Sequence, residues 1–369
     1  MGKSRLHQLS EHGQSVWIDF LSRDLLRSGD LERRMREDAV VGVTSNPTIF
    51  QKAISTGDAY DEQLREVLAE EHDPKEIFIR LAAQDVGDAL DLLRPVWDGG
   101  GGKDGYVSIE VDPNLAADTE GTVAQAQRLH ELIDRPNLFV KIPATPEGLP
   151  AIEEMIARGR SINVTLIFSV ERYVEVAEAY VRGIERLVAA GGDPTRVASV
   201  ASFFVSRVDT EADKRLDELG EHDELKGTLA IANAKLAYAR YKEIFSGPRW
   251  EALAARGATP QRCLWASTST KNPAYRDVLY VEELIGPETV NTMPEETIGA
   301  FQDHGRVADT LEQGLAEAEA ILERFAEAGI DYDDVTLTLE REGVQKFADS
   351  FAELIEGIRA KSGELVEAA

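Results

Sequence analysis

The sequence lacks the cysteine pairs of disulfide-bonded secreted proteins and the long apolar runs of membrane proteins. It contains a single cysteine, Cys263, so no disulfide can form within the chain, as is typical of proteins from a reducing compartment. It has no run of about 18 apolar residues that would span a membrane, and no apolar N-terminal stretch typical of a signal peptide. We therefore expect a cytoplasmic protein with no membrane association.

Patterns for binding metals and nucleotides are missing as well. The 6 histidines lie outside the candidate strands and show none of the spacings of zinc or non-haem iron sites. No P-loop and no G-x-S-x-G segment occurs. Cys263 has no histidine near it in the sequence, and we expect a buried, unreactive thiol. We therefore expect no metal site.

Positive charge is scarce relative to negative charge. The 369 residues include 40 Lys and Arg against 67 Asp and Glu, a formal net charge of −27. A chain this acidic will not bind nucleic acid or an anionic membrane through its overall field. If its substrate carries a phosphate, the site needs local cations that act against that field.

The chain alternates short β-rich runs with longer amphipathic runs. Such alternation is typical of a parallel sheet with helical crossovers. Helices are expected over 77–93, 122–132, 170–188 and 272–284. Eight well-spaced strands favour a closed (β/α)8 TIM barrel over an open, doubly wound sheet. The expected strands are 16–21, 40–46, 106–111, 138–142, 162–168, 197–205, 262–267 and 289–293.

The chain is longer than a minimal barrel of about 250 residues. The additional residues are expected to form helices over 49–71, 211–255 and 307–360. None of these segments contains a linker that would mark a second domain. We therefore expect one barrel domain over 1–369, with the C-terminal helices of 307–369 packing on it.

Polar residues gather on one side of the expected strands. Successive strand residues point to opposite sides, and one side of seven strands carries polar groups, mostly in the C-terminal halves. That is the end at which barrel enzymes build their active sites. Hydroxyls such as those of Thr44, Ser108, Thr165 and Ser269 are equally well explained as satisfied core groups. The residues expected on this inner side are Asp19, Thr44, Asn46, Ser108, Glu110, Asp112, Lys141, Asn163, Thr165, Ser202, Phe204, Ser267 and Ser269.

Lys141 is the least readily explained as a structural residue. It lies in mid-strand between Val140 and Ile142, where its side chain has no helical surface along which to reach water. Burying it charged and unpaired would cost several kcal/mol, so a functional lysine is favoured. Burial also favours the neutral amine, which can attack a ketone carbonyl to form an imine. Asp19 and Glu110 can then serve as base and acid.

Several ordered motifs resemble those of the transaldolase family. Residues 42–50 (GVTSNPTIF) and 139–148 (FVKIPATPEG) resemble the two transaldolase signatures, the second of which contains Lys141. VSIEVD (107–112), NVTLIFS (163–169), SFFVSR (202–207) and WASTSTKNP (265–273) match further segments in the same order. The resemblance covers nearly the whole chain and points to the longer, bacterial and plant-type branch of the family.

The resemblance implies a role for each matching residue. Lys141 would form the Schiff base, Asp19 would be the base for cleavage, and Glu110 would transfer protons with a water held by Thr165. The substrate would be bound by Thr44, Asn46, Asn163, Ser202 and Phe204, and its phosphate by Arg207, Ser267 and Lys271. The implied reaction transfers dihydroxyacetone from sedoheptulose 7-phosphate to glyceraldehyde 3-phosphate in the pentose phosphate pathway, yielding erythrose 4-phosphate and fructose 6-phosphate. Relatives are monomers or homodimers and use no cofactor.

Two departures and three alternatives accompany the resemblance. Many relatives carry Arg where Lys271 stands, and SFFVSR replaces the commoner SPFVGR while keeping Arg207. Lysine cannot make the bidentate phosphate contact of arginine. A fructose 6-phosphate aldolase is the nearest alternative, but those relatives are shorter and usually have Tyr where Phe204 stands. A non-catalytic sugar-phosphate binding protein leaves Lys141 unexplained, and a metal-dependent aldolase lacks ligand clusters.

Overall fold

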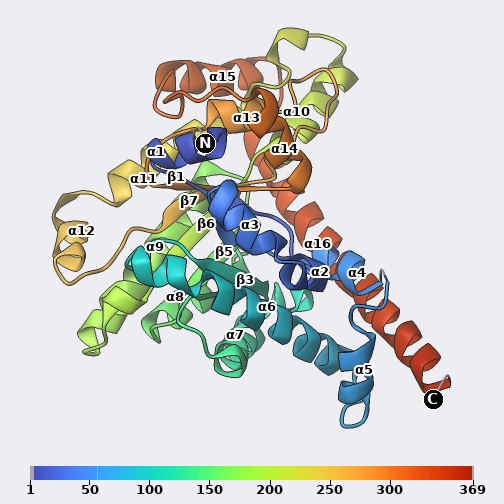
Figure 1. The fold of residues 1–369 in the computed structure, drawn as a ribbon. Helices are drawn as coiled ribbons and strands as arrows, with labels where there is room; N and C mark the ends of the chain where they lie inside the picture. The colour runs from blue at the N-terminus through green and yellow to red at the C-terminus, as the bar shows by residue number, and fades with distance from the viewer. Residues whose placement is uncertain (1–3, 56, 368–369) are drawn as a thin grey trace.

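Eight parallel strands form a closed barrel in which each strand pairs with the next and β8 pairs with β1 (Figure 1). The structure is a computed structural model that describes residues 4–55 and 57–367. The rest of the expected domain 1–369, and residue 56 of the expected helical segment 49–71, lie outside the described residues. The strands are β1 (Gln14–Ile18), β2 (Val40–Val43), β3 (Tyr106–Glu110), β4 (Leu138–Pro143), β5 (Ile162–Ile167), β6 (Ser199–Phe204), β7 (Arg262–Ala266) and β8 (Thr289–Met293).

The prediction of eight strands in a barrel is confirmed, and the prediction for the first strand is wrong by a few residues. β1 begins at Gln14, directly after Gly13, which adopts a left-handed φ of 81°. The strand ends at Ile18, so Asp19 follows it. Asp19 is still held against β8, because its backbone N–H donates to the carbonyl of Met293 at 2.9 Å.

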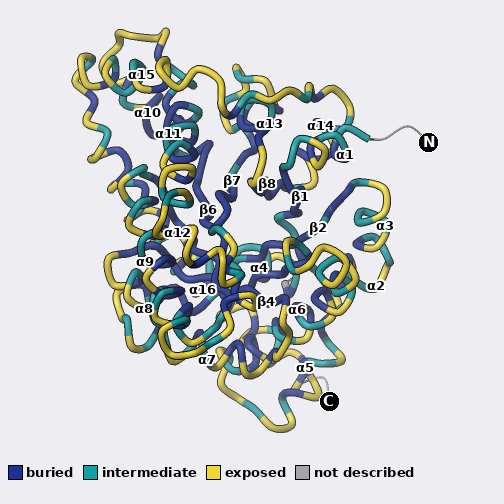
Figure 2. The backbone as a smooth tube through the Cα atoms, turned by 90° about the vertical axis from the view of Figure 1, so that its left-hand side faces the viewer, coloured by how far each residue is buried: buried dark blue, intermediate teal, exposed yellow. Residues whose placement is uncertain are grey.

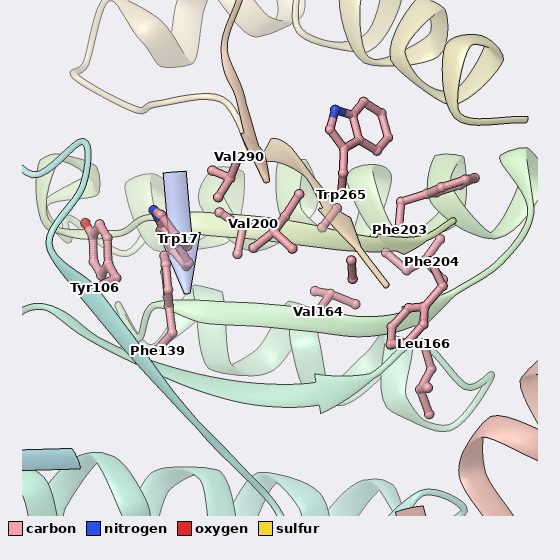
Figure 3. Close-up of a cluster of buried hydrophobic side chains, with 14 of the residues drawn as sticks. Trp17, Tyr106, Phe139, Val164, Leu166, Val200, Phe203, Phe204, Trp265 and Val290 are labelled. Carbon is pink, nitrogen blue, oxygen red and sulfur yellow. The ribbon is translucent and has the colours of Figure 1, made fainter. Parts of the chain in front are cut away.

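Aromatic side chains fill the N-terminal end of the barrel. Trp17, Tyr106 and Phe139 lie together there, and the rings of Tyr106 and Phe139 stack with centroids 4.1 Å apart (Figure 3). Gly42 makes room for this cluster, because a Cβ at this position would lie 2.5 Å from the Trp17 ring. This end of the barrel is therefore a packed core, as in other barrels of this type.

Helices surround the buried strands and expose their outer turns (Figure 2). Three of the four expected helices fall inside α6, α7 and α9. The helix expected over 272–284 is wrong except for a short piece, because Asn272 and Pro273 begin a turn in which Asn272 Oδ1 accepts from Ala274 N at 2.9 Å. The helices are α1 (Arg5–Glu11), α2 (Arg23–Arg27), α3 (Asp30–Glu37), α4 (Pro47–Ser55), α5 (Asp61–Leu68), α6 (Pro74–Gly99), α7 (Thr119–Ile133), α8 (Gly148–Ala157), α9 (Val170–Ala189), α10 (Ser206–Leu219), α11 (Leu229–Ile244), α12 (Gly247–Ala254), α13 (Leu279–Glu283), α14 (Glu295–His304), α15 (Leu315–Glu327) and α16 (Tyr332–Glu367).

The last helix, α16, runs across the C-terminal end of the barrel (Figure 1). At its start, the Tyr332 hydroxyl donates to Asn233 of α11 at 2.6 Å. In its middle, Gly343 packs on the end of β5, where a Cβ would lie 3.0 Å from Leu166. Near its end, Lys361 forms an ion pair of 2.7 Å with Asp61 of α5. The helix is thus anchored on opposite sides of the barrel and covers the end at which the predicted site lies.

No helix in residues 4–55 and 57–367 combines the length and the apolar character needed to span a membrane.

Candidate active site

Strand register brings Glu110, Lys141 and Asn163 into one row. Glu110 pairs with Lys141, and Lys141 with Asn163, across the parallel strands β3, β4 and β5. Residues paired in this way point to the same side of the sheet. Lys141 Nζ lies 3.4 Å from Glu110 Oε2 and donates to the carbonyl of Ser45 at 3.2 Å. The lysine and glutamate side chains are only 7% and 5% exposed, so the amine and its carboxylate share one buried site.

Asp19 provides a second carboxylate, which is half-buried in the wall of the barrel mouth. It accepts a hydrogen bond from Thr44 Oγ1 at 2.7 Å, and Thr44 lies 2.7 Å from the hydroxyl of Thr292. Burial raises the pKa of Asp19, while the Thr44 hydrogen bond and the charges of Lys141 and Arg207 act in the opposite direction. Burial likewise raises the pKa of Glu110, against the charge of Lys141. Both carboxyls are therefore suited to exchange protons nearer neutral pH than an exposed carboxyl is.

These groups open into a cavity of about 300 Å³ at the C-terminal end of the barrel. Four predicted residues, Ser108, Glu110, Asp112 and Asn163, do not line it. β3 ends at Glu110, and Asp112 beyond it forms an ion pair of 2.7 Å with Lys75 instead. Asn163 is fully buried, donates to Ser108 at 3.0 Å and accepts from Ser202 at 2.7 Å, so it holds Ser202 in the wall. The predicted residues that do line the cavity are Asp19, Thr44, Asn46, Lys141, Thr165, Ser202, Phe204, Arg207, Ser267, Ser269 and Lys271.

Two lining side chains keep polar atoms available for a ligand. Asn46 uses its Oδ1 to accept from Ile49 N at 3.0 Å at the start of α4, which leaves its amide N–H groups to donate. The buried hydroxyl of Thr165 has no hydrogen-bond partner among the described residues. Since buried polar groups usually have partners, a hydroxyl in this position is suited to bind a water or a substrate.

Cations gather at one part of the cavity. Arg207, in the first turn of α10, lies over the Phe204 ring with 5.0 Å between its guanidinium carbon and the centroid. Lys271 donates to Ser269 at 2.7 Å, and the hydroxyls of Ser267 and Ser206 lie 2.9 Å apart. Within the described part of the chain, neither Arg207 nor Lys271 forms an ion pair with a carboxylate within 4 Å. Cations and hydroxyls in this arrangement suit a phosphate.

At two residues the backbone is left-handed, and there the side chains do not follow the predicted alternation between the two sides of a strand. Leu166 and Ser267 have φ values of 60° and 57°, which are uncommon for residues other than glycine. Strict alternation along 162–168 would place Leu166 on the same side as Val164, but the left-handed residue turns its side chain toward Gly343 of α16. Ser267 was expected inside strand 7, but β7 ends at Ala266 and the twist brings Ser267 to the cavity. The two strained residues lie at the active end of the barrel, where such strain is often found.

The prediction missed nine residues that line the site, namely Thr48, Ile49, Lys52, Ala266, Thr292, Pro294, Glu296, Lys346 and Phe347. Thr292 of β8 is paired with Trp17 and points inward, so the alternation of strand 8 would have indicated it. Lys346 and Phe347 come from α16, and the ring centroid of Phe347 lies 5.9 Å from Lys141 Nζ. The sequence pattern that could have indicated Lys346 and Phe347 is a shared helix face. Its residues follow the spacing i, i+3, i+4, i+7, namely Gly343, Lys346, Phe347 and Ser350.

Within residues 4–55 and 57–367, no three His, Cys, Asp or Glu side chains are grouped as metal ligands. A buried lysine on a barrel strand, with two carboxylates and a cationic end to its cavity, defines a barrel enzyme equipped for imine chemistry. The model of the transaldolase/fructose-6-phosphate aldolase family matches residues 16–358, and the chain belongs to that family.

Relatives with high identity carry the name transaldolase. The chain is 57% identical to the transaldolase of Acidothermus cellulolyticus, over 95% of this chain and 94% of that protein. It is 54% identical to the transaldolase of Frankia alni, over 97% of each chain, and 52% identical to that of Mycobacterium bovis, over 96% of each.

Proposed function

We propose that this enzyme is a transaldolase, which moves a dihydroxyacetone unit from sedoheptulose 7-phosphate to glyceraldehyde 3-phosphate through a Schiff base on Lys141. The observation that carries the proposal is the buried Lys141 amine, 3.4 Å from Glu110 in a cavity that also contains Asp19. Relatives that cover nearly the whole chain bear the name transaldolase. The predictions of a cytoplasmic location and of a monomer or homodimer belong to the same proposal.

In the first stage, the neutral amine of Lys141 attacks the C2 carbonyl of the ketose, and the carbinolamine loses water. Glu110 protonates the carbonyl oxygen as the amine attacks, takes up the proton that the nitrogen then loses, and donates it to the departing hydroxyl, which leaves the iminium. Its pKa is raised by burial and it faces Nζ, so it is suited to these transfers. The Thr165 hydroxyl, which has no partner among the described residues, holds the water that relays these protons.

In the second stage, Asp19 takes the proton of the C4 hydroxyl. The bond between C3 and C4 breaks, its electron pair moves into the iminium to give an enamine on Lys141, and erythrose 4-phosphate leaves. The enamine then attacks the aldehyde of glyceraldehyde 3-phosphate, which takes back the proton from Asp19. Hydrolysis of the new imine releases fructose 6-phosphate and restores Lys141.

Hydrogen bonding and charge orient the substrate. The amide of Asn46 and the hydroxyl of Ser202 bind the dihydroxyacetone part, with Asn163 acting through Ser202. Thr44 holds Asp19, and Phe204 forms the wall beneath Arg207. Arg207, Ser267 and Lys271 bind the phosphate at the far end of the sugar.

Release of free dihydroxyacetone, as in a fructose 6-phosphate aldolase, is the second candidate because the matching family includes both activities. Phe204 argues against it. Its ring packs between Phe168, at 5.1 Å, and Arg207, and it has no hydroxyl with which to promote hydrolysis of the enamine.

The test is to trap the intermediate. The protein is incubated with fructose 6-phosphate, reduced with borohydride and analysed by intact mass and peptide mapping. We expect one reduced dihydroxyacetone adduct on the peptide that contains Lys141, and turnover that needs an acceptor aldehyde. A folded protein that binds the sugar without an adduct would contradict the imine mechanism. Rapid release of dihydroxyacetone without an acceptor would favour the aldolase.

A further inference from the structure

The cationic end of the cavity contains a residue from the C-terminal helix. Lys346 of α16 lines the same cavity as Arg207 and Lys271, although it is 139 residues away from Arg207 in the sequence (346 minus 207). The charge of Arg207 is the largest influence that lowers the pKa of Lys346, followed by burial and by the charge of Lys271. The two charge effects require Lys346 to lie near both Arg207 and Lys271, in agreement with the cavity that all three line.

No carboxylate neutralises this cluster directly. Among the described residues, Lys346, Arg207 and Lys271 form no ion pair within 4 Å, whereas most exposed lysines and arginines of this chain do. The nearest opposing charges act at longer range: Asp19 and Glu342 on Arg207, while Glu296 also lines the cavity. In a chain with a net charge of −27, three cations left together without a paired carboxylate indicate an anion as their partner.

The position of Lys346 is fixed by its helix. One face of α16 lies on the mouth of the barrel through three neighbouring contacts. A Cβ on Gly343 would lie 3.0 Å from Leu166, the Phe347 ring lies 5.9 Å from Lys141 Nζ, and Ser350 accepts from Thr48 at 2.9 Å. Lys346 belongs to this face, and its side chain, although exposed, lies at the rim of the cavity.

We propose that Lys346 is a third phosphate-binding residue, which acts with Arg207 and Lys271 and makes the C-terminal helix part of substrate recognition. The inference rests on the proposed function, since it assumes that the substrate is a sugar phosphate. Lysine at position 271 contributes a point charge without the paired donors of arginine, and a further cation at 346 compensates for this.

The test compares Lys346→Gln with Lys346→Arg and with Arg359→Gln, a matched loss of one charge at an exposed position of the same helix. The donor kcat/KM is measured for fructose 6-phosphate and for fructose, and binding of inorganic phosphate is measured by calorimetry at constant ionic strength. A hydrogen bond to a charged group is worth about tenfold or more in affinity. We therefore expect Lys346→Gln to lower kcat/KM for fructose 6-phosphate and the affinity for phosphate about tenfold, and to change kcat/KM for fructose less than about twofold.

Lys346→Arg should restore most of the loss, and Arg359→Gln should behave like the wild type. The inference is overturned if Lys346→Gln leaves both values within about twofold of the wild type, or if it affects fructose and fructose 6-phosphate equally. Failure of the proposed function has a different signature, namely a wild-type protein that forms no reduced adduct on Lys141. Phosphate binding measured by calorimetry still tests Lys346 in that case.

Discussion

Both ends of the barrel contain an arginine and carboxylates, but in the described part of the chain the arginine is ion-paired at the N-terminal end and has no carboxylate partner at the C-terminal end. At the N-terminal end, the buried Arg262 guanidinium contacts Asp104 at 3.0 Å and Ser15 at 2.9 Å. Asp104 also accepts from Ser15 at 2.7 Å and from Trp17 Nε1 at 3.1 Å. At the C-terminal end, Arg207 has no carboxylate partner within 4 Å among the described residues, and burial lowers its pKa.

The difference separates stabilising charges from functional ones. A buried ion pair with every polar atom satisfied stabilises the fold only as long as both partners remain. Carboxylates and cations that are buried without full pairing cost stability, and such sites are retained where their charge serves binding or catalysis. The comparison therefore predicts that substitutions at the two ends change different quantities. Substitutions at the N-terminal end should change stability, and substitutions at the C-terminal end should change activity.

The largest effect is expected from Lys141→Met. Methionine fills a similar volume but cannot form an imine, so we expect turnover and borohydride trapping to fall below detection. The fold should survive, because burial already raises the pKa of Glu110, so its carboxyl can take up a proton and stay neutral when the Lys141 amine is gone. Met is also well tolerated in apolar surroundings. Circular dichroism and thermal unfolding check the fold. Retained trapping on another lysine would show that the strand 4 site is not the reactive one.

The next effect concerns the pH dependence set by Asp19. The base must be unprotonated, so kcat/KM falls as the pH falls through the pKa of Asp19, which burial has raised. Asp19→Asn should reduce kcat by about 10²- to 10⁴-fold. Thr44→Val removes a hydrogen bond that favours the carboxylate, so the acid limb should move to higher pH.

The profile is best measured with fructose as the donor, since a phosphate monoester itself titrates near a pKa of about 6. Thr48→Val, which removes a hydroxyl that bonds to Ser350 and not to Asp19, is the control. An unmoved acid limb in Thr44→Val would mean that Asp19 is not the group that limits activity at low pH.

A paired substitution separates the two ends directly. Arg262→Met leaves Asp104 beside Trp17 without its cation. Breaking a fully buried ion pair costs about 3–5 kcal/mol of the free energy of unfolding, and since the Asp104 side chain is 16% exposed we expect the lower part of that range. The kcat/KM of the folded fraction should stay unchanged. Arg207→Met should leave stability nearly unchanged and lower kcat/KM for fructose 6-phosphate. Denaturant unfolding and donor kinetics on both variants test this, and equal losses of stability would remove the distinction between the ends.

Much of this organisation could be predicted from the sequence because strand alternation is a local rule. Lys141 and Glu110 point inward on regular strands, and the register then places them side by side without further information. The rule fails where the backbone departs from β geometry. Leu166 and Ser267 adopt left-handed conformations that a leucine or a serine does not reveal in a sequence.

Strand alternation cannot predict contacts between segments that are far apart in the sequence. The amphipathic pattern of α16 indicates a helix with one packed face, but not which part of the barrel that face covers. Lys346 therefore could not be assigned to the site until Gly343 was found against Leu166 and Phe347 over Lys141. Asn163 shows the opposite error: its inward direction was predicted, but its amide is used to hold Ser202.

The smallest effect is expected from replacing a residue of left-handed conformation with glycine at the N-terminal end of the barrel. Ala39, directly before β2, has a φ of 53° and is nearly buried. A left-handed conformation costs an L-residue about 1–2 kcal/mol, and the greater freedom of glycine in the unfolded chain offsets part of the gain. Ala39→Gly should therefore raise the free energy of unfolding by no more than about 1 kcal/mol and leave kcat/KM unchanged. Ser267→Gly relieves a similar φ of 57° at the C-terminal end, but it removes a hydroxyl from the part of the cavity proposed to bind phosphate, so it should also lower kcat/KM for fructose 6-phosphate. If both variants changed the free energy of unfolding and neither changed kcat/KM, the left-handed conformation of Ser267 would have no role in substrate binding. The two ends of the barrel would then not differ in what their left-handed residues do.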